Sequence, residues 1–203
     1  MQDLFSAPDT GAFYKEVRDG LIHYDGAFLE RPQADALKEK FRQEIEWNQE
    51  SMNMYGKKVL FPRLTAWYGD SGRPYSFSGI TLQPHEWTPE LAHLRDRLNE
   101  KCETKFNSLL LNLYRDERDS ISWHQDAERE LGSNPIIASI SLGGTRTFQL
   151  RRKDDHKEKL QYDLGHGSLL VMAGPLQHHW QHAIAKSKVP CGERINLTFR
   201  TIH

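Results

Sequence analysis

The chain has 203 residues, enough for one domain with a sizeable hydrophobic core, since most domains contain about 100–200 residues. Hydrophobic residues make up 37% and charged residues 27%, a composition that excludes a disordered chain. The formal net charge of −1 excludes a strong overall attraction to nucleic acid or acidic membranes, and two cysteines exclude a disulfide-rich scaffold.

The beginning of the chain lacks the basic and apolar regions of a signal peptide. Further along, no apolar run approaches the length of a membrane span. We therefore expect a cytoplasmic protein without membrane contact, or a nuclear one if its source is eukaryotic.

Two amphipathic helices are predicted in the first half of the chain. The first follows Arg31-Pro32 and carries Leu37, Phe41 and Ile45 on one face. The second begins at Thr88-Pro89-Glu90, which supplies a capping hydroxyl, a proline at the first helical position and an acid in the first turn. We expect both helices to cover a hydrophobic core.

Short strands are predicted in the second half, where residues typical of strands alternate with glycine turns. The expected strands are 108–114, 136–142, 146–151, 168–173 and 194–202. Several closely spaced strands indicate a sandwich or a barrel. The fold class is therefore α+β and mainly β, with an antiparallel core.

A metal site is indicated by His124 and Asp126. In an extended segment, residues two apart point to the same side, so an imidazole and a carboxylate can converge on one cation. The third ligand is expected from the segment 178–182, which contains three histidines. Two histidines and one carboxylate with an open face are typical of non-haem Fe(II) oxygenases. A zinc hydrolase or a merely polar strand end are the alternatives.

Four polar residues alternate along the last predicted strand and therefore share one face: Arg194, Asn196, Thr198 and Arg200. Two guanidiniums buried without anions would be unfavourable, and an internal dicarboxylate would compensate for them. Asn112 and Tyr114 alternate in the same way on another strand. A metal triad beside buried arginines describes Fe(II) with 2-oxoglutarate, whereas an edge strand with solvated arginines is the alternative.

Several motifs together resemble the AlkB-type Fe(II)/2-oxoglutarate dioxygenases that demethylate nucleic acids, and especially the eukaryotic-type branch that prefers single strands. The matching segments are 62–69, 106–115, 123–126, 135–139, 166–170, 180–182 and 194–200. The resemblance runs from about residue 50 to residue 203.

The resemblance implies one catalytic domain over residues 1–203, built on a double-stranded β-helix, the jelly-roll fold shared with cupins. Residues 1–50 would form an N-terminal support, residues 51–87 a nucleotide-recognition lid, and residues 105–203 the jelly-roll core. The two predicted helices would support this core.

The resemblance also implies roles for individual residues. The metal ligands, which are also the catalytic residues, would be His124, Asp126 and His182. The 2-oxoglutarate site would comprise Asn112, Tyr114, Arg194, Asn196 and Arg200, with Arg194 on the far carboxylate and Arg200 on the carboxylate nearer the iron. The substrate-binding residues would be Tyr55, Arg63, Tyr75, Phe77 and Glu128.

Within these substrate residues, Tyr75 and Phe77 would stack on the damaged base and Glu128 would hold its positive charge. Tyr55 would act as an aromatic wedge. Arg63, Lys57 and Lys58 would contact the phosphate backbone, as would Arg151 to Lys153 unless they form a solvated cluster. The chain departs from the branch at Ala127, where an acid is expected, and this affects lesion preference.

The implied function is repair of alkylated DNA by oxidative demethylation. Fe(II), 2-oxoglutarate and O2 would remove the methyl group of N1-methyladenine or N3-methylcytosine, releasing formaldehyde, succinate and CO2. We expect a monomer acting on single strands. The alternatives are a catalytically weak module that binds methylated nucleic acid, and the same dioxygenase chemistry on RNA or another substrate.

Overall fold

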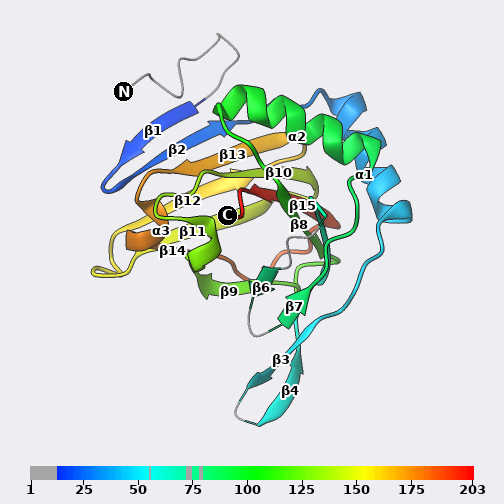
Figure 1. Cartoon of the computed structure of the whole chain (residues 1–203). Coiled ribbons are helices and arrows are strands. Elements are labelled where there is room, and N and C mark those ends of the chain that lie inside the picture. The colour runs from blue at the N-terminus through cyan, green and yellow to red at the C-terminus, as the bar shows by residue number, and fades with distance from the viewer. Residues whose placement is uncertain (1–12, 55, 72–74, 78–79) are drawn as a thin grey trace.

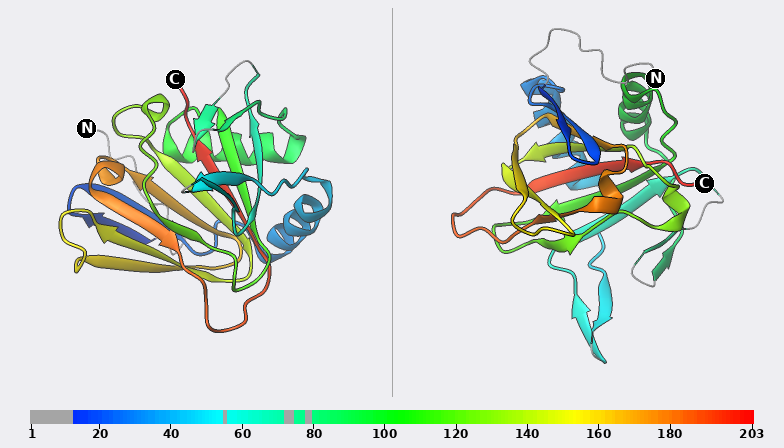
Figure 2. Two further views of the ribbon diagram at one scale, coloured as in Figure 1. Left: turned by 90° about the horizontal axis from the view of Figure 1, so that it is seen from below. Right: turned by 90° about the vertical axis from the view of Figure 1, so that its left-hand side faces the viewer.

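Two antiparallel sheets form the centre of the molecule, and two helices cover the outer face of the larger sheet (Figure 1). The computed structural model describes residues 13–54, 56–71, 75–77 and 80–203. The views in Figure 2 show the helices on one side of the large sheet and the small sheet on the other. This arrangement confirms the predicted jelly-roll class with two supporting helices.

The large sheet has seven strands in the order β1-β2-β13-β10-β15-β8-β5. Their bounds are β1 Phe13–Val17, β2 Gly20–Asp25, β5 Leu64–Gly69, β8 Ser108–Tyr114, β10 Ile137–Gly143, β13 Ser168–Ala173 and β15 Arg194–Arg200. The small sheet has the order β12-β11-β14-β9. Its strands are β9 Ile121–His124, β11 Arg146–Arg152, β12 Lys159–Leu164 and β14 Trp180–Ile184.

Both predicted helices are present. They are α1 (Arg31–Glu44) and α2 (Pro89–Cys102), of 14 residues each. The Thr88 hydroxyl caps α2 by accepting a hydrogen bond from the Leu91 amide at 3.3 Å, as the sequence predicts. The one-turn helix α3 (Leu176–His179) precedes β14, and a 3-10 turn η1 spans Arg129–Leu131. Within the described ranges, no helix has the length and apolarity needed to cross a membrane.

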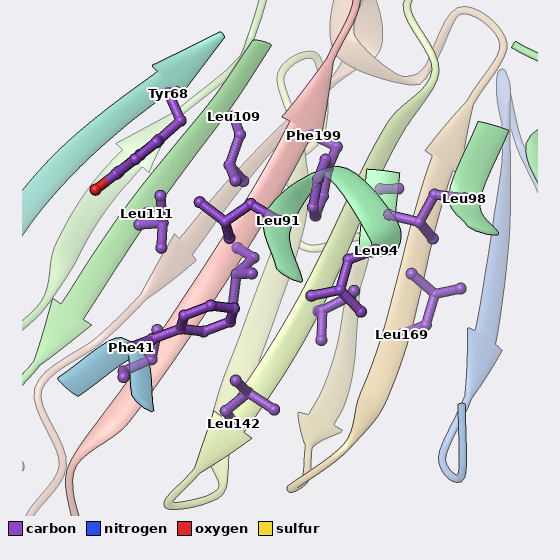
Figure 3. Close-up of a cluster of buried hydrophobic side chains, with 14 of the residues drawn as sticks. Phe41, Tyr68, Leu91, Leu94, Leu98, Leu109, Leu111, Leu142, Leu169 and Phe199 are labelled. Atoms are coloured by element: carbon purple, nitrogen blue, oxygen red, sulfur yellow. The ribbon is translucent and has the colours of Figure 1, made fainter. Parts of the chain in front are cut away.

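The main hydrophobic core lies between the helices and the large sheet (Figure 3). Helix α2 contributes Leu91, Leu94 and Leu98, which are at most 1% exposed. Phe41 of α1 packs in the same cluster. Truncating one of these leucines to alanine would cost about 2–5 kcal/mol of stability, because each leaves a cavity in a close-packed interior.

Alternation along β15 separates this core from the functional face of the sheet. Ile195, Leu197 and Phe199 belong to the core under the helices. The intervening polar side chains therefore point to the other face, toward the small sheet. The space between the two sheets is thus lined by polar groups on one wall, although β15 is buried along its whole length.

Two hairpins lie outside the sheets. They consist of β3 (Ser51–Met54) with β4 (Lys57–Leu60), and β6 (Tyr75–Phe77) with β7 (Ile80–Leu82). The β3–β4 hairpin projects away from the body (Figures 1 and 2). Strand β5, which lies between the hairpins in the chain, pairs with β8 in the large sheet. The segment 51–87 is therefore two hairpins separated by a core strand, and residues 13–25 also add two strands to the large sheet.

Candidate active site

The three predicted metal ligands converge in the structure. Potential ligand atoms of His124, Asp126 and His182 all lie within 4.8 Å of one another. His124 and His182 face each other across the β9–β14 pairing, and their ring centroids are 4.2 Å apart. Asp126 follows β9 by two residues, so the extended segment places its carboxylate on the same side as His124. These donors are close enough to be ligands of a single ion.

Hydrogen bonds leave one ring nitrogen of His124 free to act as a ligand. Its Nδ1 lies 2.8 Å from the Ser122 carbonyl oxygen, which can only accept, so Nδ1 carries the proton. The lone pair is then on Nε2, which lies 3.8 Å from Asp126 Oδ1. In this arrangement an imidazole nitrogen and a carboxylate oxygen point at the same space.

The charge of Asp126 is fixed by Arg200. The Arg200 Nη2 donates to Asp126 Oδ2 at 2.7 Å, and Nε donates to the same oxygen at 3.2 Å. Burial alone would raise the pKa of Asp126, but Arg200, His182 and His124 lower it well below its usual range. Arg200 therefore keeps Asp126 ionised as a ligand. The sequence predicts that Arg200 pairs with a carboxylate of 2-oxoglutarate, whereas in the structure its partner is Asp126.

His182 is held neutral by its surroundings. It is 4% exposed, and burial lowers its pKa to about 3, with a further contribution from His124. Its Nδ1 is buried and has no hydrogen-bond partner among the described residues. A neutral imidazole with an unsatisfied nitrogen is the form that binds a divalent metal.

Gln177 supports the site and was not found by sequence reasoning. Its side chain is 1% exposed, and its Oε1 accepts the Asp126 amide hydrogen at 3.0 Å. Its Nε2 donates to Met172 Sδ at 3.6 Å. Gln177 thus ties the helix before β14 to the loop that carries Asp126. The only sequence signal for Gln177 is its position next to the histidine-rich segment 178–182. Its partner Asp126 is 51 residues away, so the sequence does not reveal the contact.

Arg194 lies at the other end of the same cavity. Its Nη2 donates to Ser141 Oγ at 2.8 Å, and its guanidinium carbon lies 5.3 Å from the centroid of the Tyr114 ring. Its Nε and Nη1 are buried and have no hydrogen-bond partner in the described part of the chain. Burial lowers the pKa of Arg194 to about 10, yet the group stays charged at neutral pH.

The other predicted co-substrate residues surround Arg194. Asn196 donates to Ser139 Oγ at 2.7 Å and accepts from Thr198 at 3.0 Å. Asn112 accepts from Arg63 Nε at 2.8 Å. The serines of β10 lie in the strand predicted at 136–142, for which no role in the site was predicted. The structure shows that this alternation directs their hydroxyls at the polar face of β15.

One cavity of about 640 Å³ is lined by most of these groups, and it extends from the β3–β4 hairpin to the interior between the sheets. The three metal ligands, Arg194 and Asn112 all line it. An anionic ligand with two carboxylates fits this distribution, because one end meets an unsatisfied guanidinium and the other meets the metal-ligand triad. Cavities of about 300–1,000 Å³ are typical of small-molecule sites.

The predicted substrate residues lie in different surroundings in the structure. Glu128 lines the cavity, and its buried Oε2 has no hydrogen-bond partner within the described residues. Arg63 is only 6% exposed and its guanidinium is turned inward to Asn112, so it belongs to the cavity wall and not to the surface expected for a phosphate contact. Tyr75 and Phe77 lie on β6, and their roles stay predictions. Tyr55 lies outside the described residues.

The residues of the basic cluster at the end of β11 differ in exposure, since Arg152 is buried and Lys153 is exposed. The Arg152 side chain is 2% exposed and binds Asp19 at 2.7 Å and Asp154 at 2.7 Å. The prediction that Arg152 contacts a phosphate backbone is therefore wrong, because its guanidinium is buried and already pairs with these two aspartates. Arg151 lies on the opposite face of the strand, above the Trp123 ring.

Comparisons with known proteins agree with this geometry. A family model described as the 2OG-Fe(II) oxygenase superfamily matches residues 20–200. Alpha-ketoglutarate-dependent dioxygenase alkB homolog 3 of Homo sapiens is 42% identical over 185 residues, which cover 87% of this chain and 64% of that protein. DNA oxidative demethylase ALKBH2 of Homo sapiens is 37% identical over 204 residues, which cover 95% of this chain and 78% of that protein.

A solved structure supports the fold. The solved structure of a protein named OsALKBH1 aligns with a TM-score of 0.59 and 18% identity, covering 93% of this chain and 99% of that chain. The chain spans 62–64% of the length of the alkB homolog 3 proteins that it matches. The comparison therefore concerns only the part of those proteins that aligns with this chain.

Proposed function

Because this chain belongs to the 2OG-Fe(II) oxygenase superfamily, we propose that it is a dioxygenase that demethylates alkylated bases in nucleic acid. Its substrates are N1-methyladenine and N3-methylcytosine in single-stranded DNA. The observation that carries the proposal is the Arg194 guanidinium, buried with two unsatisfied nitrogens in the same cavity as the His-Asp-His triad. A metal site alone would not need this cation.

The chain's residues fit the two groups that such chemistry requires. His124, Asp126 and His182 would hold Fe(II), and Arg194 would bind the far carboxylate of 2-oxoglutarate. When bound, these groups activate O2 to oxidise a methyl C–H bond, with succinate and CO2 as co-products. Arg200 keeps the aspartate ligand ionised.

The substrate end of the cavity suits a positively charged base. Both proposed lesions carry a positive charge and are blocked at the pairing edge, which favours their extrusion from a stack. Glu128 supplies a carboxylate whose buried oxygen has no protein partner within the described ranges. Tyr75 and Phe77 are proposed to stack on the base. The hydroxylated methyl group then leaves the repaired base as formaldehyde.

The test is a turnover assay with the whole chain, Fe(II) and 2-oxoglutarate. The substrate is a single-stranded oligonucleotide with one N1-methyladenine, and mass spectrometry follows methyl loss while succinate is counted. Methyl loss that matches succinate, and that is absent from a His124→Ala variant, is the expected result. Succinate formed without methyl loss would contradict the substrate and leave the oxygenase intact.

Competition separates the remaining substrate classes. Methylated single-stranded DNA, the same sequence as duplex, methylated RNA and a methyl-lysine peptide are offered together at equal concentration. We expect the single-stranded DNA to be consumed first. Preferential loss of the RNA or peptide methyl group would replace the proposed substrate. A chain that binds methylated strands but forms no succinate would be a binding module.

A further inference from the structure

The two histidines of the metal triad are joined by the weakest pairing of the small sheet. Strand β9 is one of the two edge strands of that sheet. Its register with β14 comprises His182 opposite His124 and Ile184 opposite Ile121, with an irregularity between these pairs. The His124 side chain is 31% exposed. Strand pairing alone therefore gives little support to the geometry of the two ligands.

Arg151 contacts both of these strands from the outer face of the sheet. It lies on β11 directly opposite Gln181 of β14. Its Nε and Nη2 both donate to Gln181 Oε1, at 3.1 and 2.9 Å. Its guanidinium carbon lies 4.3 Å from the centroid of the Trp123 ring on β9. One side chain of the neighbouring strand thus reaches across β14 to the edge strand.

Both residues held by Arg151 immediately precede a metal-binding histidine. Gln181 precedes His182, and Trp123 precedes His124. Consecutive side chains of a strand point to opposite faces, so fixing one on the outside also fixes the backbone from which the next projects inward. Arg151 is therefore placed to set the separation of the two imidazoles without contacting either of them.

We propose that Arg151 is a positioning residue for the metal centre, acting through Trp123 and Gln181 from the face of the sheet opposite the cavity. This inference rests on the metal centre of the proposed function, and it is independent of the substrate. It assigns to Arg151 a role other than the phosphate contact expected from the sequence. A guanidinium suits this role because it combines a flat stacking surface with several fixed donors.

The test measures metal binding by the whole chain, using Co(II) and its visible absorption in the presence of 2-oxoglutarate. Arg151→Met keeps the apolar stem and removes the stacking cation and both donors. We expect its Kd for Co(II) to rise about three- to tenfold, less than the ~10–100-fold typical of partners bonded directly to a ligand. The Co(II) spectrum is expected to change as well, which a general loss of stability would not cause.

Three further variants make the test specific. Arg151→Lys keeps the charge above Trp123 but loses the two-donor fork, so its Kd should fall between those of the native chain and Arg151→Met. Gln181→Leu removes the acceptor and should weaken Co(II) binding less than Arg151→Met. The matched control is Gln149→Met, an outward-facing substitution on the same strand opposite Ala183, and its Kd should stay within about twofold of the native value.

The outcomes are distinguishable. A native Co(II) affinity and spectrum in Arg151→Met would overturn the inference, even if its melting temperature fell. Loss of oligonucleotide affinity with unchanged Co(II) binding would show a phosphate contact instead. If Arg151→Met does not fold, Arg151→Lys and Gln181→Leu carry the test, and native Co(II) binding in both would overturn the inference. Failure of the native chain to bind Co(II) would contradict the metal centre itself.

Discussion

Two buried arginines flank the Tyr114 ring, and they differ in how far their donors are satisfied. Arg146 donates to the backbone carbonyls of Asp116, Asp119 and Ala185, at 3.1, 2.9 and 2.7 Å. Arg194 donates to Ser141, but two of its nitrogens have no partner in the described part of the chain. Arg146 thus holds loops in place, whereas Arg194 is available to an anion in the cavity.

This difference leads to a prediction for Arg194→Met. The KM for 2-oxoglutarate should rise at least about tenfold, because the far carboxylate loses a charge-assisted hydrogen-bond partner. Hydrogen bonds of this kind contribute about 1.5–3 kcal/mol each. The free energy of unfolding without 2-oxoglutarate should not fall, because a desolvated cation is removed. Steady-state kinetics and urea unfolding measure the two effects. An unchanged KM would contradict the role of Arg194 in binding 2-oxoglutarate. Ser141→Ala, which removes only the acceptor of one Arg194 hydrogen bond, serves as a milder control.

Glu128 is predicted to act through its charge. Glu128→Gln keeps the shape of the side chain but removes the carboxylate facing the base. We expect kcat/KM for the cationic N1-methyladenine to fall about 10-fold, as for the loss of a desolvated charge pair of about 1.4 kcal/mol. An uncharged methylated base should be affected less. Equal losses on charged and uncharged bases would show that Glu128 has only a structural role.

At the scale of elements, much of the fold follows from local patterns. The strands at 108–114 and 168–173 have the predicted bounds, and α2 begins where its capping residue Thr88 indicates. Helix α1 begins at the predicted Arg31-Pro32 without a side-chain cap. Strands β9 and β14 were not predicted, because each is short and carries polar ligands instead of an alternating apolar pattern. Strand β5 was assigned to the lid because its pairing with β8 is a long-range contact.

The candidate site was predictable to a similar degree. The His124/Asp126 pair and the polar face of β15 depend on spacing within one segment, which a sequence displays directly. The third ligand, His182, lies on another strand, and the family resemblance identified it. Gln177, Ser139 and Ser141 act through partners that are 51, 57 and 53 residues away in the chain. Residues of this kind have no local signature, since only the folded topology brings them to the site.

The ion pairs of Arg152 connect three elements. Arg152 ends β11 and binds Asp154 in the following turn and Asp19 in the β1–β2 turn, while its guanidinium lies 5.7 Å from the Trp180 ring of β14. The hydrogen bond from Arg152 is the main cause that lowers the pKa of Asp154 below its ordinary value. This pairing therefore stabilises the fold only while Asp154 is ionised.

The pH dependence of stability tests this connection. A carboxyl with a lowered pKa in the folded state stabilises above its unfolded pKa of about 3.9, and the contribution is lost as the pH falls through the lowered value. Asp154→Asn should thus be less stable than the native chain near neutral pH, and the difference should shrink below about pH 4. Urea unfolding across this range measures it, with the exposed Glu86→Gln as control. A constant difference down to the most acidic pH would contradict the assignment.

At the scale of the whole molecule, a net charge of −1 means that the proposed nucleic-acid substrate would have to be held by local cations. Lys57 and Lys58 are exposed on β4, in the hairpin that projects from the body beside the cavity wall. Val59 and Leu60 of the same strand are 40% and 54% exposed. The hairpin thus offers both charge and apolar surface to a strand.

Salt dependence is the measurement that suits this scale. For single strands, each phosphate contact contributes about −0.7 to the slope of log K against log salt concentration. The double variant Lys57→Gln/Lys58→Gln should reduce the magnitude of that slope by up to about 1.4 if both lysines contact phosphates. Lys159→Gln, an exposed substitution on β12, is the matched control. Equal slopes for all three proteins would exclude the hairpin as the phosphate contact.

The two faces of the large sheet have a consequence for how this chain tolerates change. Strand β15 presents Ile195, Leu197 and Phe199 to the helices and its polar residues to the cavity, so one backbone serves two independent environments. Repacking under the helices alters hydrophobic contacts that do not reach the cavity. Thermal robustness and substrate range are thus separable traits, open to improvement by different sets of substitutions in the same sheet.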